Sequence, residues 1–191
     1  MKAKQLIALS AIATALFASN ALAKPYPSGT QLAEKQEIVL NNGAEVTSID
    51  PAKQAAEPAF NLGRDLFEGL TVQDKQGKTI PGIAESWQAN DNNTVYTFTL
   101  RQSQWSNGDS LTAHDFVYSW QRLIDPKTAS PYAWFAAIPG IKNSAKIMKG
   151  EAPANTLGVR AIDEHTFEVT LEKPVPFFIK LLSHPVLAPV H

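Results

Sequence analysis

The chain has 191 residues with 17 basic and 18 acidic side chains, so its net charge is −1 at neutral pH. This balance excludes the basic patch that a nucleic-acid-binding protein needs to neutralise phosphates. The sequence contains no cysteine, so disulfides, thiolate metal sites and a cysteine nucleophile are excluded as well.

Residues 1–23 have the three-part pattern of a secretory signal peptide. Two lysines supply the positive start, an apolar run covers 6–17, and Ala21 and Ala23 are the small residues that a signal peptidase reads. The apolar run is shorter than the roughly 20 residues that a membrane-spanning helix requires. We therefore expect cleavage after Ala23, delivery of the mature chain to the periplasm, and no insertion of the mature chain into the membrane.

The first predicted elements of the mature chain are a short strand and a helix. Residues 37–40 are mostly apolar and precede an Asn-Asn-Gly sequence, which predicts a strand followed by a turn. From residue 58 onward the apolar spacing becomes helical, and the helix is predicted to end near Gly69. The predicted apolar face of this helix consists of Leu62, Leu66 and Phe67.

Two later segments, 95–100 and 166–171, alternate strictly between apolar and polar residues, which predicts half-buried strands. The residues expected on their buried faces are Tyr96, Phe98, Leu100, Phe167, Val169 and Leu171. Threonines on the opposite face of both segments favour an antiparallel sheet with one solvated side.

An amphipathic helix is predicted between these two strands. Thr112 and Asp115 have the spacing of a capping box at its start, and Asp125 before a proline ends it. Apolar residues form one stripe along it, namely Phe116, Val117, Trp120, Leu123 and Ile124.

Two shorter helices complete the expected secondary structure. One covers 141–149 and ends at Gly150, and the other begins at Pro176. The apolar members of the second are Phe177, Phe178, Leu181 and Leu182. Strands and helices together predict an α+β fold with a mainly antiparallel sheet.

The side chains that could perform catalysis or bind a metal do not form a recognised motif. The four histidines are His114, His165, His184 and His191. No two of them have the i, i+4 spacing, with a glutamate between, of a zinc-binding helix. Residues 163–165 (Asp-Glu-His) precede a strand, where a solvated turn is a better interpretation than a catalytic cluster. Asp65 and Glu68 indicate a solvated helix face, so we expect no catalysis, no metal and no cofactor.

Trp134 lies in a predicted loop directly after the sequence Ser-Pro-Tyr that ends at Tyr132. Large aromatic residues in loops often contact a binding partner. For Trp134 both partner contact and core packing remain open.

A series of ordered motifs resembles the family 5 extracellular solute-binding proteins, the peptide- and nickel-binding class. The motifs occupy 48–51, 64–70, 81–87, 97–101, 105–108 and 111–120. Segments 121–126 and 130–135 resemble the oligopeptide branch of the family, and the resemblance covers the whole mature chain.

This resemblance implies a fold like that of type II periplasmic binding proteins, in which two lobes close over the ligand. Residues 24–67 would be the N-terminal piece of lobe I, and 68–191 an accessory small α+β domain. Family members are much longer, so we expect this chain to be an N-terminal fragment without the opposing lobe.

The resemblance also implies the ligand, the partners and the contacting residues. The ligands would be oligopeptides, murein peptides among them, delivered to an inner-membrane ABC permease with its ATPase subunits. Tyr132 and the backbone of Ala55, Ala56 and Glu57 would contact the peptide, which pairs with the protein like an added strand. We expect a monomer.

Two other functions are weighed against this one. The accessory domain could act as a chaperone-like or protein-interaction module without a closed ligand cleft. A periplasmic hydrolase ranks last, because no nucleophile, base and orienting group converge in the sequence.

Overall fold

The structure, a computed structural model, describes residues 29–191, so the predicted signal peptide lies outside the described residues. The chain forms two units, Met1–Asn41 and Asn42–His191. The strand predicted over 37–40 is wrong: no strand forms there, and Val39 is 96% exposed. Three consecutive apolar residues do not form a strand alone, because the backbone N–H and C=O groups of a strand need the hydrogen bonds of a neighbour.

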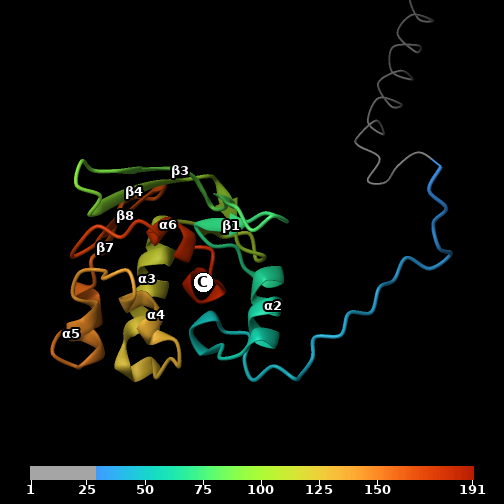
Figure 1. Ribbon diagram of the computed structural model, residues 1–191, viewed down its shortest axis with the longest axis horizontal. Helices are drawn as coiled ribbons and strands as arrows, with labels where there is room; N and C mark the ends of the chain where they lie inside the picture. Colours follow the sequence, from blue (N-terminus) through green and yellow to red (C-terminus); the bar gives the residue numbers. More distant parts are fainter. Residues whose placement is uncertain (1–28) are drawn as a thin grey trace, which may run out of the picture. The chain divides into compact units, whose positions relative to one another are not determined.

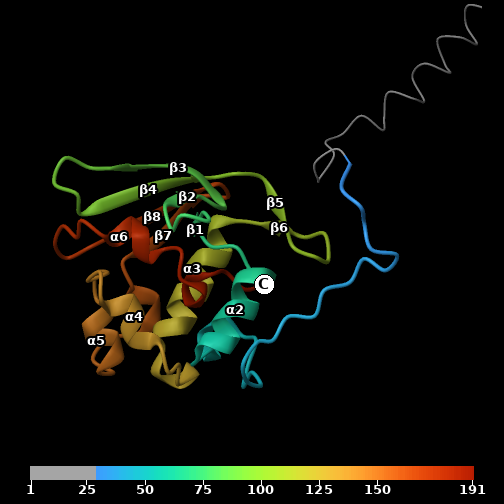
Figure 2. The ribbon, with the colours of Figure 1, turned by 45° about the vertical axis from the view of Figure 1, so that its right-hand side comes forward.

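A four-stranded antiparallel sheet in the order β3-β4-β8-β7 forms one layer of the second unit (Figures 1 and 2). Its strands are β3 (Ala84–Ala89), β4 (Val95–Leu100), β7 (Val159–Asp163) and β8 (Thr166–Thr170). Phe98 of β4 lies opposite Phe167 of β8, and both side chains are fully buried. The predicted alternation is confirmed, because all six residues expected on the inner face are buried.

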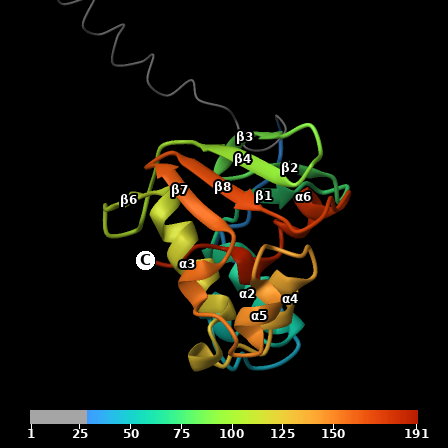
Figure 3. The ribbon, with the colours of Figure 1, turned by 90° about the vertical axis from the view of Figure 1, so that its left-hand side faces the viewer.

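Helix α3 (Ala113–Ile124) packs against the buried face of this sheet (Figure 3). The rings of Phe116 and Trp120 lie 5.6 Å and 5.2 Å from the ring of Phe167. The predicted start of the helix is confirmed, because the Asp115 carboxylate accepts a hydrogen bond from the Thr112 backbone N–H at 2.6 Å. The sheet and α3 therefore form the core around which the other elements pack.

Short helices gather on the α3 side of the sheet, and two small ribbons extend from it (Figures 1 and 2). The helices are η1 (Pro51–Lys53), α2 (Glu57–Leu66), η2 (Pro126–Thr128), α4 (Ala133–Ala137), α5 (Ser144–Met148), η3 (Ala154–Thr156), α6 (Phe178–Leu181) and η4 (Pro185–Leu187). The ribbons pair β1 (Thr71–Gln73) with β2 (Thr79–Pro81), and β5 (Ser103–Gln104) with β6 (Ser110–Leu111).

Helix α2 forms as predicted but buries a different face. Its buried residues are Ala59, Phe60 and Gly63, whereas Leu66 is 58% exposed. A Cβ atom at Gly63 would lie 2.7 Å from Nε2 of the buried Gln54 side chain and 3.1 Å from Cβ of Pro185, so the lack of a side chain at Gly63 permits this close packing. The small residues on this face let the helix approach its neighbours closely and so set its orientation. The prediction that the larger apolar residues form the buried face is wrong.

The two shorter helices exist but span fewer residues than predicted. Helix α5 ends before Gly150, which has a positive φ of 74°, and α6 leaves Phe177 outside the helix and 51% exposed. The expected domain boundary between residues 67 and 68 stays a prediction, since the compact unit Asn42–His191 runs across it.

Candidate functional site

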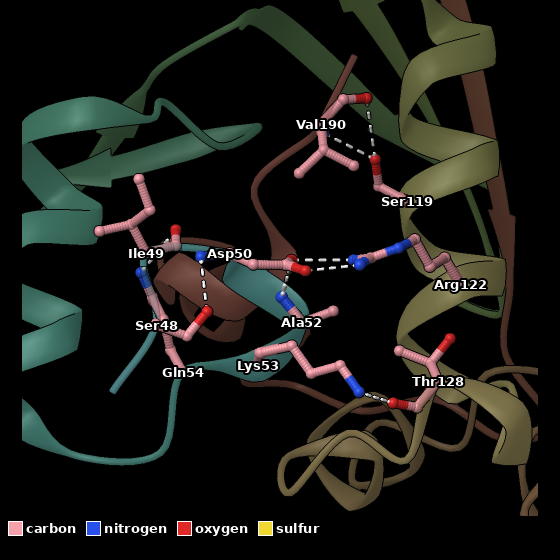
Figure 4. A network of polar contacts seen from close by, with 10 residues as sticks. All are labelled: Ser48, Ile49, Asp50, Ala52, Lys53, Gln54, Ser119, Arg122, Thr128 and Val190. Carbon is pink, nitrogen blue, oxygen red and sulfur yellow. Dashed lines mark hydrogen bonds and ion pairs between the residues drawn. The ribbon is translucent and has the colours of Figure 1, made fainter. Parts of the chain in front are cut away.

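Asp50 anchors the segment that leads to the predicted peptide-contacting backbone (Figure 4). Its carboxylate accepts hydrogen bonds from the Ala52 backbone N–H at 3.0 Å and from both terminal nitrogens of Arg122 on α3, at 2.8 Å and 2.5 Å. The Arg122 hydrogen bond is the main cause that lowers the pKa of Asp50, and Asp50 raises the pKa of Arg122. A bidentate ion pair therefore fixes η1 against the core helix.

Two further contacts hold the same segment. Lys53 donates a hydrogen bond from Nζ to the backbone oxygen of Thr128 (Figure 4), and Thr128 belongs to η2, directly before the loop that holds Tyr132. Gln54 is fully buried, and its Nε2 lies 3.4 Å from the backbone oxygen of Ile49. The segment after Asp50 is therefore tied both to α3 and to η2, which leads into the loop around Tyr132.

Tyr132 belongs to a cluster of aromatic rings that joins three separate parts of the chain. Its ring lies 5.0 Å from Phe60 of α2, 5.2 Å from Trp134 and 5.8 Å from His184, on which it stacks. Trp134 is 48% exposed, and its Nε1 donates a hydrogen bond to the Pro131 oxygen at 3.0 Å. The cluster holds Tyr132 half-buried at the surface.

Ala55, Ala56 and Glu57 are exposed and lie at the start of α2, about one helical turn before Phe60. Ala56 has extended backbone angles (φ −145°, ψ 160°). Among the described residues, no partner accepts a hydrogen bond from the backbone N–H of these three residues. Because Phe60 contacts Tyr132, the structure brings the four predicted residues to one region; their contact with a peptide remains a prediction.

His184 was not expected at this site, because its position in the sequence gives no motif. Its ring lies 4.8 Å from Phe60 and 4.4 Å from Phe135, and its Nδ1 accepts a hydrogen bond from the Val186 backbone N–H at 3.3 Å. Burial lowers the pKa of His184 to about 4, and the positive charge of Arg64 adds to this effect. The imidazole is therefore neutral near pH 7. Only the contacts of the folded chain identify it.

Two other candidate residues, Asp163 and Glu68, form contacts within the fold. Asp163 accepts hydrogen bonds from the His165 backbone N–H at 2.8 Å and the Thr166 hydroxyl at 2.9 Å, within the turn between β7 and β8. Glu68 forms an ion pair with Arg101 at 2.5 Å. Within residues 29–191 no group of three or more histidine, cysteine, aspartate or glutamate side chains could hold a metal, and no helix is long and apolar enough to cross a membrane.

A family model described as bacterial extracellular solute-binding proteins, family 5, middle region, matches residues 78–191. The chain is 53% identical, over 188 residues, to the periplasmic oligopeptide-binding protein OppA of Salmonella typhimurium, covering 98% of this chain and 34% of that protein. It is 50% identical to the periplasmic murein peptide-binding protein MppA of Escherichia coli, covering 90% of this chain and 32% of that protein.

Solved structures have the same fold. The unliganded open form of the murein tripeptide-binding protein MppA superposes with a TM-score of 0.82 at 49% identity, over 86% of this chain and 32% of that one. Haemophilus influenzae OppA in complex with the peptide RPPGFSPFR gives a TM-score of 0.81 at 46% identity, over 84% and 32%. The predicted type II binding-protein-like fold is confirmed. The chain spans about a third of the length of these relatives.

Proposed function

Because this chain belongs to the bacterial extracellular solute-binding proteins of family 5, we propose that it captures oligopeptides in the periplasm for import by an ABC transporter. One observation carries the proposal: the free backbone of Ala55, Ala56 and Glu57 lies in the same region as Tyr132. A protein that accepts many peptides must recognise their shared backbone, and unpaired N–H groups beside an aromatic side chain suit that task.

Other parts of the proposal follow from the relatives. Proteins named oligopeptide-binding and murein peptide-binding are similar to this chain at 50% identity or more, so both ligand classes are candidates. We propose export through cleavage after Ala23, a monomeric mature chain without catalysis, and delivery of the peptide to a permease with ATPase subunits. Intact-mass measurement of the periplasmic protein tests the cleavage, since it should begin at Lys24.

Peptide affinity in a two-lobed binder depends on closure, which removes water from the ligand and aligns both walls on it. Residues 1–191 match about a third of their relatives' length, and tested on their own they would present one wall to the peptide. Loss of several backbone hydrogen bonds and charge-assisted contacts would cost more than about 4 kcal/mol, or roughly a thousandfold in affinity. We expect no binding of tri- to pentapeptides to this chain in calorimetry at micromolar concentration.

The decisive experiment uses a chimera in which this chain replaces the matching third of the Salmonella relative. Calorimetry should detect peptide binding by the chimera, and Tyr132→Ala should weaken it. Tyr118→Ala, at an exposed tyrosine on α3, is the matched control and should have no effect. A chimera whose peptide binding does not change on Tyr132→Ala would contradict the proposed site, and tight peptide binding by the present chain alone would contradict the need for a second wall.

A further inference from the structure

A cavity of about 330 Å³ lies next to the aromatic cluster, between α2, β1, α4 and the segment that contains α6. It shares His184 and Phe135 with the surroundings of Tyr132, because the His184 ring lies 4.4 Å from Phe135 and 5.8 Å from Tyr132. A group bound at Tyr132 would therefore have this cavity within reach of its side chains.

The charges that line the cavity are of one sign. Arg64 and Lys180 face it, and no acidic side chain lines it. Nη1 of Arg64 donates to Glu57 and Asn61, both at 2.9 Å; its Nε and Nη2 donate no hydrogen bond to any residue that the structure describes. Lys180 is exposed and has no ion pair among residues 29–191.

This charge distribution differs from that of a larger cavity, of about 620 Å³, beside β5. There Arg101 lines the wall together with Glu164, whereas no acidic side chain lines the cavity beside His184. Each cavity has one paired arginine, since Arg101 pairs with Glu68 and Arg64 pairs with Glu57, but the cavity beside His184 also has Lys180, which forms no ion pair among residues 29–191. The cavity beside His184 is therefore the more favourable one for an added negative charge.

The rest of the lining is largely apolar. Phe135, Phe177 and Leu181 contribute to the wall, and Phe177 is 51% exposed. An exposed aromatic ring beside an unpaired ammonium group suits a ligand with an apolar stem and a charged end. His184 adds no charge at neutral pH, because burial and Arg64 lower its pKa to about 4.

We propose that this cavity, here called the acid pocket, receives an acidic side chain of the bound peptide. The methylene stem packs on Phe177 and Leu181, and the carboxylate faces Lys180 and Arg64. The inference rests on the proposed function, because it assigns a side-chain preference to the same peptide site.

The test follows backbone amide resonances of the ¹⁵N-labelled chain by NMR, because binding of a single amino-acid group is weak. N-acetylglutamate α-amide carries only a side-chain carboxylate and should shift the amides of 180–184 in a saturable manner. N-acetylglutamine amide has the same shape without the charge, and N-acetylalanine carries only a C-terminal carboxylate. Both should bind at least about fivefold more weakly than the glutamate probe.

Lys180→Gln should weaken binding of the glutamate probe about fivefold and leave the glutamine probe unchanged. Lys146→Gln, at an exposed lysine on α5, is the matched control and should change neither. Equal binding of the glutamate and glutamine probes, or insensitivity to Lys180→Gln, would overturn the acid pocket. Stronger binding of N-acetylalanine would assign the cavity to a C-terminal carboxylate and would also overturn it. Peptide capture by the chimera is measured separately, so either proposal can fail alone.

Discussion

Replacement of Arg122 by glutamine tests whether the ion pair with Asp50 holds the peptide-contacting segment in place. The substitution removes the charged fork and retains most of the aliphatic stem of the side chain. Asp50 keeps its hydrogen bond from the Ala52 backbone N–H but loses both bonds from the guanidinium. Water molecules must then replace these two hydrogen bonds to the carboxylate, whose side chain is 31% exposed.

Hydrogen bonds to charged groups contribute about 1.5–3 kcal/mol each when buried. Both partners here are about a quarter to a third exposed, and exposed pairs contribute only about 0–1 kcal/mol. We therefore expect Arg122→Gln to lower the free energy of unfolding by about 1–2 kcal/mol at neutral pH. Urea unfolding followed by tryptophan fluorescence measures this difference, and hydrogen exchange should accelerate at 52–57.

The difference should depend on pH, because the Arg122 hydrogen bond lowers the pKa of Asp50 in the folded chain. A carboxyl group with a lowered pKa stabilises the fold above its unfolded value of about 3.9, and this stability is lost as the pH falls through the folded value. Wild type and Arg122→Gln should therefore converge in acid. An equal difference at neutral pH and at about pH 3 would refute the reasoning.

Arg160 provides a matched control for this experiment. It also forms a two-point ion pair, with Glu168 across β7 and β8, at 2.6 Å and 3.0 Å. The Arg160 side chain is 66% exposed, so Arg160→Gln should cause a smaller loss and leave exchange at 52–57 unchanged.

Three further predictions concern packing, titration and local stability. Gly63→Ala should lower the melting temperature, because the new Cβ would lie 2.7 Å from a buried Gln54 atom. Overpacking costs about 1–3 kcal/mol of stability, which exceeds the gain of about 1 kcal/mol from the higher helix propensity of alanine. A higher melting temperature would contradict this packing. The free energy of unfolding of the wild type should fall as the pH is lowered from about 6.5 to about 4, because His184 binds a proton in the unfolded chain at a higher pH than in the folded chain. His184→Phe should reduce this dependence on pH, and an unchanged dependence would assign it to other groups. Hydrogen exchange should be slow in β4 and β8 and fast at 37–40, whereas equal protection of all three would mean that 37–40 has found a strand partner.

The sequence predicts the elements whose pattern depends on their own residues. Strict alternation identified β4 and β8, and the stripe through Trp120 identified α3, because each presents one apolar face to the same core. The orientation of α2 could not be predicted in this way. Its buried face depends on Gly63 and on the distant Pro185, whose Cβ would lie 3.1 Å from a Cβ at Gly63.

The candidate site, too, could be predicted only in part. The resemblance to a family pointed to Tyr132 and to the start of α2, whereas no local pattern connects Asp50 with Arg122, 72 residues later. His184 could likewise not be predicted from the sequence, because a histidine that stacks on a tyrosine has no fixed spacing from it in the chain. These contacts join segments that are far apart in the sequence, so no periodic pattern in the sequence predicts them.

The position of α3 in the middle of these contacts has a consequence for the order of folding. Asp50 pairs with α3 from 72 residues upstream, and the buried Trp120 indole donates to the backbone oxygen of Leu187, 67 residues downstream, at 2.9 Å. Two long loops must therefore close on one helix, and non-local closure slows folding because chain entropy is lost before the contacts form. The Ser119 hydroxyl of α3 also accepts a hydrogen bond from the Val190 backbone N–H at 2.8 Å. During synthesis, α3 would therefore emerge from the ribosome well before these partners, so the unit can complete its packing only after residue 190 has been released.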